Sequence, residues 1–183
     1  MADVKNKKKW YEVLSTKHFG NQVIGETLAN EDKAVMGRLV EAGLGSLTKD
    51  IKLQNIKIKF KINEIIDGKA NTEIKGYELT TNYIKRIVRS GRSKIEDSFL
   101  LTTKDNVKVR VKPLILTKYK SQNNVLSEIR RFVQSEFNDY MQRETYDKFV
   151  SDLISKTIQR ELRSKMNKIY PISLFEIRIM NKI

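Results

Sequence analysis

Residues 56–63, IKIKFKIN, show the clearest alternation of apolar and polar positions in the chain. Every second residue is Ile or Phe, and lysines lie between them. Because successive side chains of a strand point to opposite faces, this pattern predicts a strand with one apolar and one cationic face. The cationic face carries Lys57, Lys59 and Lys61.

A second segment, VKVRVK at 107–112, repeats this alternation with valines on one face. Its polar face carries Lys108, Arg110 and Lys112. Two turn signals predict hairpins that involve these segments. Asp-Gly at 67–68 follows the first segment, and Lys-Asp-Asn at 104–106 precedes the second.

The hydrophobic period changes to about 3.6 residues in three other stretches. Residues 80–91 fit a short helix, with a threonine able to cap its start and a glycine able to end it. Apolar residues recur at helical spacing over 125–141 and again over 146–162. Pro171 stops that pattern, and alternation resumes in the segment that follows it.

This order of elements predicts an α+β fold. A mostly antiparallel, barrel-like body is expected over about 10–120, with one helix inserted in it. Two longer C-terminal helices are expected over about 122–168, followed by a final strand over about 172–180. Residues 1–9 form a basic N-terminal tail in this interpretation, and 10–183 form one globular domain.

The composition is strongly cationic, with 36 Lys and Arg against 22 Asp and Glu and a formal net charge of +14. The excess is concentrated in acid-free segments at 51–63 and 84–94, whereas 21–50 is rich in acids. A surface of this kind attracts nucleic acid or an anionic membrane. The charge therefore indicates a polyanionic partner.

The sequence offers little support for a membrane protein or an enzyme. No apolar run approaches the roughly 20 residues that a spanning helix needs, and no secretory signal follows the N-terminal lysines. There is no cysteine, which excludes disulfides, thiolate metal sites and cysteine nucleophiles, and His18 is the only histidine. We expect a cytoplasmic protein with no catalytic residue, no metal and no cofactor.

Two interpretations of the cationic strand faces stay open. Lysine on the outer face of a strand is often simply solvated, and it also protects sheet edges from aggregation. Two like-charged rows in one sheet repel each other, however, which favours an anionic ligand that neutralises both rows. The net charge and the acid-free clusters favour polyanion binding.

Three arginines at 86–92 recur every three residues, along the predicted short helix and its exit. Their planar guanidinium groups suit phosphate oxygens. The alternative is that Arg86, Arg89 and Arg92 form structural ion pairs. The carboxylates that such pairs would use are Glu64, Glu78 and Glu96.

Trp10 and Tyr11 follow directly on the lysines of the tail. Trp10 is either a packing anchor or a platform on which an RNA base stacks. The candidate RNA-binding residues are Lys7, Lys8, Lys9, Trp10, Lys57, Lys59, Lys61, Arg86, Arg89, Arg92, Lys108, Arg110, Lys112, Lys118 and Lys120.

Several longer stretches follow one another in a characteristic order: KKKWYEV, HFGNQVIGETLA, GRLVEAGLGSLTKD, LQNIKIKF, GYELTTNYIKRIVRSG, LLTTKDN and IYPISLFEIR. In these stretches the chain resembles the archaeal and eukaryotic small-subunit ribosomal protein family called S three-a-e, or eukaryotic-type S one. The resemblance runs from about Lys8 to Arg178. The long basic extensions of eukaryotic members are absent, which favours an archaeal member.

The resemblance implies a structural constituent of the small ribosomal subunit, with a barrel-like body and no catalytic residue or cofactor. It implies a place on the platform near the mRNA exit, in contact with small-subunit rRNA and neighbouring ribosomal proteins, and mRNA near the exit channel. The alternative is a free-standing, RNA-binding regulatory protein with a barrel core.

Overall fold

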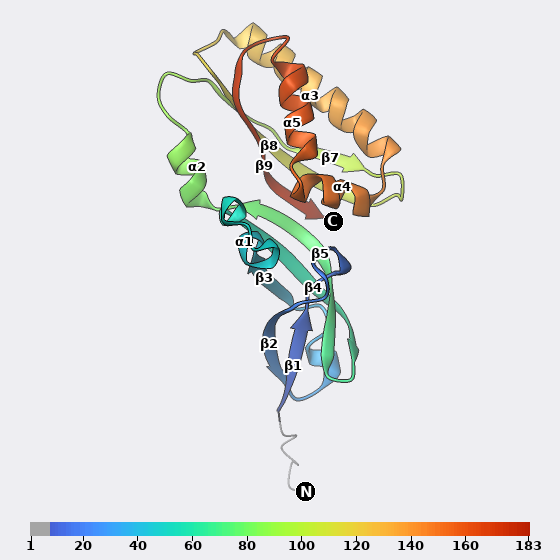
Figure 1. Ribbon diagram of the computed structural model, residues 1–183. Coiled ribbons are helices and arrows are strands. Elements are labelled where there is room, and N and C mark those ends of the chain that lie inside the picture. The colour runs from blue at the N-terminus through green and yellow to red at the C-terminus, as the bar shows by residue number, and fades with distance from the viewer. Residues whose placement is uncertain (1–7) are drawn as a thin grey trace, which may run out of the picture. The chain divides into compact units, whose positions relative to one another are not determined.

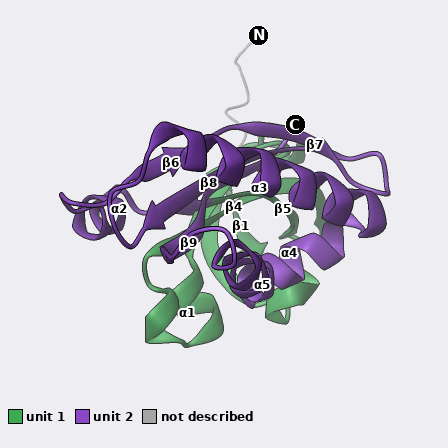
Figure 2. Ribbon diagram, turned by 90° about the horizontal axis from the view of Figure 1, so that it is seen from above, with its two compact units in different colours: residues 1–77 green, residues 78–183 purple. Residues whose placement is uncertain are grey.

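The computed structural model of the protein describes residues 8–183 (Figure 1). Lys7 and most of the predicted N-terminal tail therefore lie outside the described residues. The chain divides into two compact units, up to Tyr77 and from Glu78 onward, which Figure 2 shows in green and purple. The prediction of a single globular domain over 10–183 stays a prediction.

Unit 1 is built mainly from strands. Strand β1 pairs with β2 in antiparallel and with β5 in parallel orientation, β5 also pairs with β4, and β4 pairs with β3 in antiparallel orientation. Its elements are β1 (Lys9–Leu14), η1 (Lys17–Phe19), β2 (Val23–Ala29), η2 (Asp32–Ala34), β3 (Leu39–Gly43), α1 (Leu44–Thr48), η3 (Ile51–Leu53), β4 (Ile56–Ile66) and β5 (Lys69–Leu79).

The core of unit 1 is formed by the apolar faces of these strands. Tyr11 and Val13 of β1 are buried together with Val35, Ile62 and Ala70. The predicted hairpin between β4 and β5 is confirmed, because its two turn residues take left-handed φ angles of +50° at Asp67 and +76° at Gly68. This conformation matches the twist of paired strands and is typical of Asp-Gly.

Unit 2 places helices against an antiparallel sheet. Strand β8 pairs with β9 along one side and with β6 and β7 along the other, all antiparallel. Its elements are α2 (Thr81–Ile87), β6 (Lys94–Glu96), β7 (Phe99–Thr102), β8 (Lys108–Thr117), α3 (Asn123–Arg143), α4 (Tyr146–Ile154), α5 (Thr157–Met166) and β9 (Ile172–Lys182).

The helical layer of unit 2 packs on the sheet through an aromatic series. The Phe137 ring of α3 lies 6.3 Å from the Phe99 ring and 6.2 Å from the Phe175 ring, measured between centroids. The buried residues of α3 recur every four positions and include Ile129, Val133, Phe137 and Met141. The predicted helical periodicity therefore marks the face that packs against the sheet.

Strand β8 changes register against β9 between Lys112 and Pro113. On its other side, the register of β7 ends at Val111 and that of β6 begins at Leu114. Pro113 has no N–H to donate, so its place at this interruption leaves no ladder bond broken. This explains why the segment 94–103 forms two short strands, β6 and β7.

The predicted α+β class with mostly antiparallel strands is confirmed, and the described strands do not close into a barrel. The predicted inserted helix is α2. The second long C-terminal helix is interrupted, however, because Lys156 takes a left-handed φ of +59° between α4 and α5. The predicted hairpin at 104–106 is confirmed, with Asn106 at φ +59°.

Candidate nucleic-acid interface

The basic row of β8 is exposed as the alternation predicted. Val109 and Val111 are fully buried, whereas Lys108 and Arg110 are exposed and Lys112 is half-buried. Within residues 8–183, no ion pair joins these three cations to a carboxylate. The row is therefore uncompensated positive charge on a strand that is paired on both sides.

The residues of the adjacent strands that lie in register with this row have uncharged side chains. Leu100 and Thr102 of β7 lie in register with Arg110 and Lys108. On the other side, Asn181 lies opposite Arg110, and Ile179 lies opposite Lys112. An anion that approaches this face meets three cations, and no Asp or Glu side chain lies in register with them.

The lysine row of β4 differs, because one carboxylate partly neutralises it. Glu41 of β3 lies in register with Lys59 and is 3.7 Å from its Nζ, and 3.5 Å from the Nζ of Lys57. Lys61 lies opposite the exposed Leu39. Exposed ion pairs of this kind contribute about 0–1 kcal/mol, so they remain exchangeable. This row belongs to unit 1.

The three arginines occupy a helix end and the loop after it. Helix α2 ends at Ile87, and Val88 is extended, so Arg89 and Arg92 do not continue a helical row. The Arg86 guanidinium lies 5.5 Å from the centroid of the Tyr83 ring, and Arg92 Nη1 donates to Ser173 Oγ at 3.0 Å. The expectation that the three share one side is therefore only partly met.

The carboxylates suggested as alternative partners, Glu64, Glu78 and Glu96, form no ion pair with these arginines. Glu96 accepts from Arg178 at 3.0 Å and from Lys94 at 3.1 Å. In the described chain, no ion pair joins Arg86, Arg89 or Arg92 to a carboxylate. A ring positions the guanidinium group of Arg86 and a hydroxyl positions that of Arg92, and neither contact neutralises the positive charge.

Trp10 is 66% exposed on the outer face of β1, opposite Leu28. Its neighbour Tyr11 is buried instead, and its hydroxyl donates to Asp32 Oδ1 at 2.6 Å. That hydrogen bond raises the pKa of Tyr11. The packing-anchor interpretation therefore fits Tyr11 rather than Trp10, and Lys8 and Lys9 lie exposed beside Trp10.

Lys118 and Lys120 flank an exposed tyrosine just after β8. The Nζ of Lys118 lies 5.6 Å from the centroid of the Tyr119 ring. The backbone there is fixed, since Lys118 N donates to Pro171 O at 2.9 Å and the Tyr170 hydroxyl donates to Lys120 O at 3.3 Å. These residues extend the cationic character beyond the end of β8.

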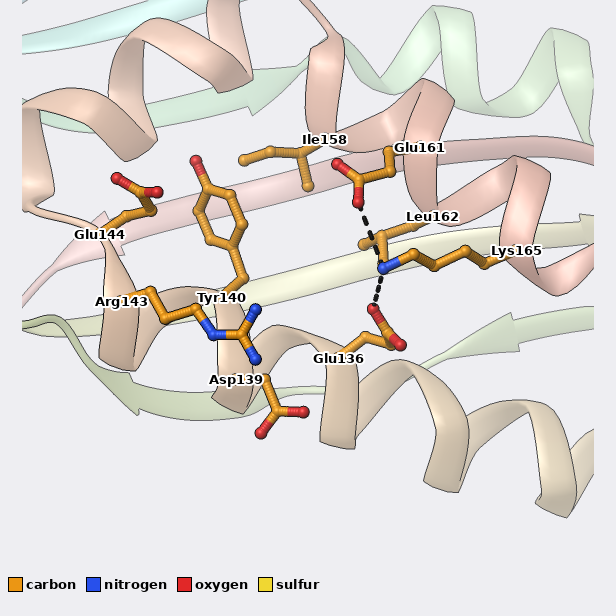
Figure 3. A pocket seen from close by; sticks show the side chains of 9 residues that line it. All are labelled: Glu136, Asp139, Tyr140, Arg143, Glu144, Ile158, Glu161, Leu162 and Lys165. Atoms are coloured by element: carbon orange, nitrogen blue, oxygen red, sulfur yellow. Dashed lines mark hydrogen bonds and ion pairs between the residues drawn. The ribbon is translucent and has the colours of Figure 1, made fainter.

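A pocket between α3 and α5 has the opposite charge (Figure 3). Lys165 bridges two of its carboxylates, with Nζ 2.6 Å from Glu136 Oε2 and 3.2 Å from Glu161 Oε1, and these bonds raise the pKa of Lys165. Burial and a 2.6 Å hydrogen bond to Asp152 raise the pKa of Tyr140. The pocket lining also includes Asp139 and Glu144. These carboxylates would repel a phosphate group, so the pocket does not suit phosphate.

Two further features bear on the class of protein. Residues 8–183 contain no group of three or more His, Cys, Asp or Glu side chains arranged to hold a metal ion. None of the helices in that range is long and apolar enough to cross a membrane. Fold and surfaces together define a small basic α+β protein with uncompensated cations on a sheet face and on a loop.

Comparisons with known proteins identify the family. The model of the Ribosomal S3Ae family matches residues 1–182. Small ribosomal subunit protein eS1 of Halorubrum lacusprofundi is 34% identical over 174 residues, which cover 95% of this chain and 81% of that protein. The protein of the same name from Methanothermobacter thermautotrophicus is 30% identical, over 97% of this chain and 91% of that protein. The one from Desulfurococcus amylolyticus is 35% identical, over 96% of this chain and 84% of that protein. The chain belongs to the Ribosomal S3Ae family.

Proposed function

We propose that the protein is a structural, non-catalytic constituent of the small ribosomal subunit that holds rRNA through its cationic surfaces. The names of its relatives support the assembly, and the near-complete overlap with them supports an equivalent role. The observation that supports the RNA contact is the row Lys108, Arg110 and Lys112, which lies on the outer face of β8 with no Asp or Glu side chain in register.

The mechanism is positioning by charge. Each cation that meets a phosphate releases condensed counterions, which favours binding and makes it depend on salt. A strand buried on its other face holds the three charges at fixed spacing, so the phosphate backbone of the RNA is held in a defined path. If about six phosphates are engaged in all, the logarithm of affinity falls with the logarithm of salt at a slope of roughly −4 to −5.

The arginine segment supplies a second contact. Arg86 is held against Tyr83 and Arg92 against Ser173. The guanidinium groups of these two arginines are therefore partly ordered before RNA binds. Ordered guanidinium groups lose less conformational entropy on binding phosphate than free lysines do. Arg89, which is exposed in the loop between them, completes this contact.

The remaining candidates form smaller contacts in this proposal. Trp10 offers a base-stacking surface beside Lys8 and Lys9, and the β4 lysines exchange Glu41 for phosphate. Lys118 and Lys120 extend the β8 row, and Lys7 belongs to the same basic segment as Lys8. In this proposal these contacts lie on the platform near the mRNA exit, beside neighbouring ribosomal proteins, as the family resemblance implies.

Sedimentation of the native protein from a cell extract tests the proposal. We expect it to migrate with small subunits through a sucrose gradient, in stoichiometric amount, and to stay bound after a moderate-salt wash. Migration near the top of the gradient with RNA binding retained would instead support a free-standing regulatory RNA-binding protein. Migration near the top without RNA binding would contradict both.

A further inference from the structure

One edge of the unit 2 sheet is hollowed into a groove of about 470 Å³. Strand β7 and the hairpin after it form one wall, and α3 forms the other. This volume lies within the roughly 300–1,000 Å³ of small-molecule sites. The side chains that matter for its chemistry are Leu100, Thr102, Lys104, Asn106, Asn138 and Gln142.

The two walls are joined by hydrogen bonds, so the groove exists before a ligand binds. Lys104 N donates to Glu144 O at 3.2 Å, and Tyr146 N donates to Asp105 Oδ2 at 3.1 Å. Within the hairpin, Asn106 N donates to the carbonyl oxygen of Thr103 at 2.9 Å. A preformed groove of this kind binds with little loss of conformational entropy.

Carboxamides dominate the polar lining. Asn138 and Gln142 are four residues apart, so both lie on the face of α3 that borders the groove. Asn106 adds a third carboxamide from the hairpin. Among the described residues, no side-chain hydrogen bond engages any of the three, and no carboxylate lines the groove. The lining therefore offers paired donors and acceptors without negative charge.

The edge of β7 adds backbone groups. Thr103 N donates to Val107 O at 3.0 Å, so the residues of the same parity bond to β8. The N–H and C=O groups of Leu100 and Thr102 consequently point to the free edge of the strand. The Leu100 side chain is 58% exposed and provides an apolar surface beside them.

Cations lie at the border of the groove. Lys104 lines it, and Thr102 and Leu100 lie directly across the strand pair from Lys108 and Arg110. Cross-strand neighbours are about 5 Å apart, so a chain of phosphates can pass from the groove to the β8 row. A peptide strand would need pockets for its alternate side chains. This groove has amides and cations instead, which favours a nucleotide.

We propose that this groove holds one unpaired adenine nucleotide of single-stranded RNA, with its base against Asn138 and Gln142 and its phosphate toward Lys104. A carboxamide presents a donor and an acceptor in the spacing that adenine N6 and N7 require. Unpaired bases expose these edges, and Leu100 covers part of the base face. This inference rests on the proposed RNA-binding function and names the ligand of one part of that surface.

Fluorescence anisotropy with the full chain tests it. The probes are labelled oligoadenylate and oligouridylate of about ten nucleotides, which is within the span of single-strand sites. The variant N138A/Q142A removes both carboxamides from an exposed helix face, where Ala is well tolerated. The matched control N124A/Q134A removes one Asn and one Gln from exposed positions of α3 outside the groove.

We expect the wild type to prefer oligoadenylate about tenfold, N138A/Q142A to lose that preference, and the control to keep it. The salt slope of N138A/Q142A should equal that of the wild type, because no phosphate contact is lost. Equal affinity for both probes, or a preference retained in N138A/Q142A, overturns the inference while RNA binding stands. Release of a neighbouring ribosomal protein from subunits that carry N138A/Q142A, with the preference intact, would assign the groove to protein. No binding of RNA by the wild type would remove the proposed function as well.

Discussion

Neutralising the β8 row tests the RNA contact most directly. The variant K108Q/R110Q/K112Q keeps three polar side chains of similar length on the outer face of the strand and leaves the buried Val109 and Val111 unchanged. Exposed substitutions of this kind change the free energy of unfolding by about 0.5 kcal/mol or less. The fold should therefore persist, and any loss of binding reports on charge.

The expected magnitude follows from counterion release. Each phosphate contact contributes about 0.7 to 0.9 to the slope of log affinity against log salt, so three lost contacts make the slope shallower by about 2 to 3. The structure supports the full value of three, because none of these cations is paired with a carboxylate in the described chain. Variants of Lys57 and Lys59 should change the slope less, since Glu41 competes for both.

The assay is binding of a labelled small-subunit rRNA fragment at a series of KCl concentrations. The control variant R131Q/K148Q/K168Q removes the same net charge from exposed positions in the helical part of unit 2. We expect its slope to stay close to that of the wild type. An equal loss in both variants would mean that only total charge matters, and an unchanged slope in K108Q/R110Q/K112Q would refute the role of β8.

Three further predictions concern stability. Phe137→Ala should cost about 3–5 kcal/mol in urea unfolding, because the ring lies fully buried between two other rings. Lys156→Met should cost about 3 kcal/mol, since it leaves the carboxylate of Glu176, 6% exposed and now 2.8 Å from Lys156 Nζ, without its cation. The same change at the exposed Lys148 should cost less than about 1 kcal/mol, and equal costs would contradict the argument. Finally, the free energy of unfolding should fall as pH rises above the ordinary tyrosine pKa of 10.0. The folded state raises the pKa of Tyr140, so the unfolded chain loses that proton first. Tyr140→Phe should make this fall smaller when unfolding is measured from about pH 9 to pH 11.

Local alternation predicted the two basic strands because the signal is contained in the strands themselves. At 56–63 and 107–112 the side chains that point inward are Ile, Phe and Val, and the structure buries all of them except Val107, which is half-buried. The adjacent pair Trp10 and Tyr11 was harder to assign, since only one of them can face inward. The hydrogen bond from Tyr11 to Asp32, which is distant in sequence, favours the tyrosine.

The features that sequence reasoning missed depend on tertiary contacts. Lysine does not signal a left-handed conformation, so the break at Lys156 depends on surroundings that include its ion pair with Glu176 in β9. Asn138 and Gln142 look like ordinary solvated residues of a helix. They line a groove only because the hairpin at 103–106 is hydrogen-bonded to the end of α3.

The register shift at Pro113 has a consequence for how the chain folds. Before the shift, the outward residues of β8 are cations, and after it, Leu114 and Leu116 on that side are buried. A slip of one residue would exchange the faces of the strand and drive Lys108, Arg110 and Lys112 toward the apolar layer. Burying unpaired charges there is costly, so the misaligned pairing is strongly disfavoured. The three cations of β8 therefore also disfavour incorrect pairing of the sheet that carries them.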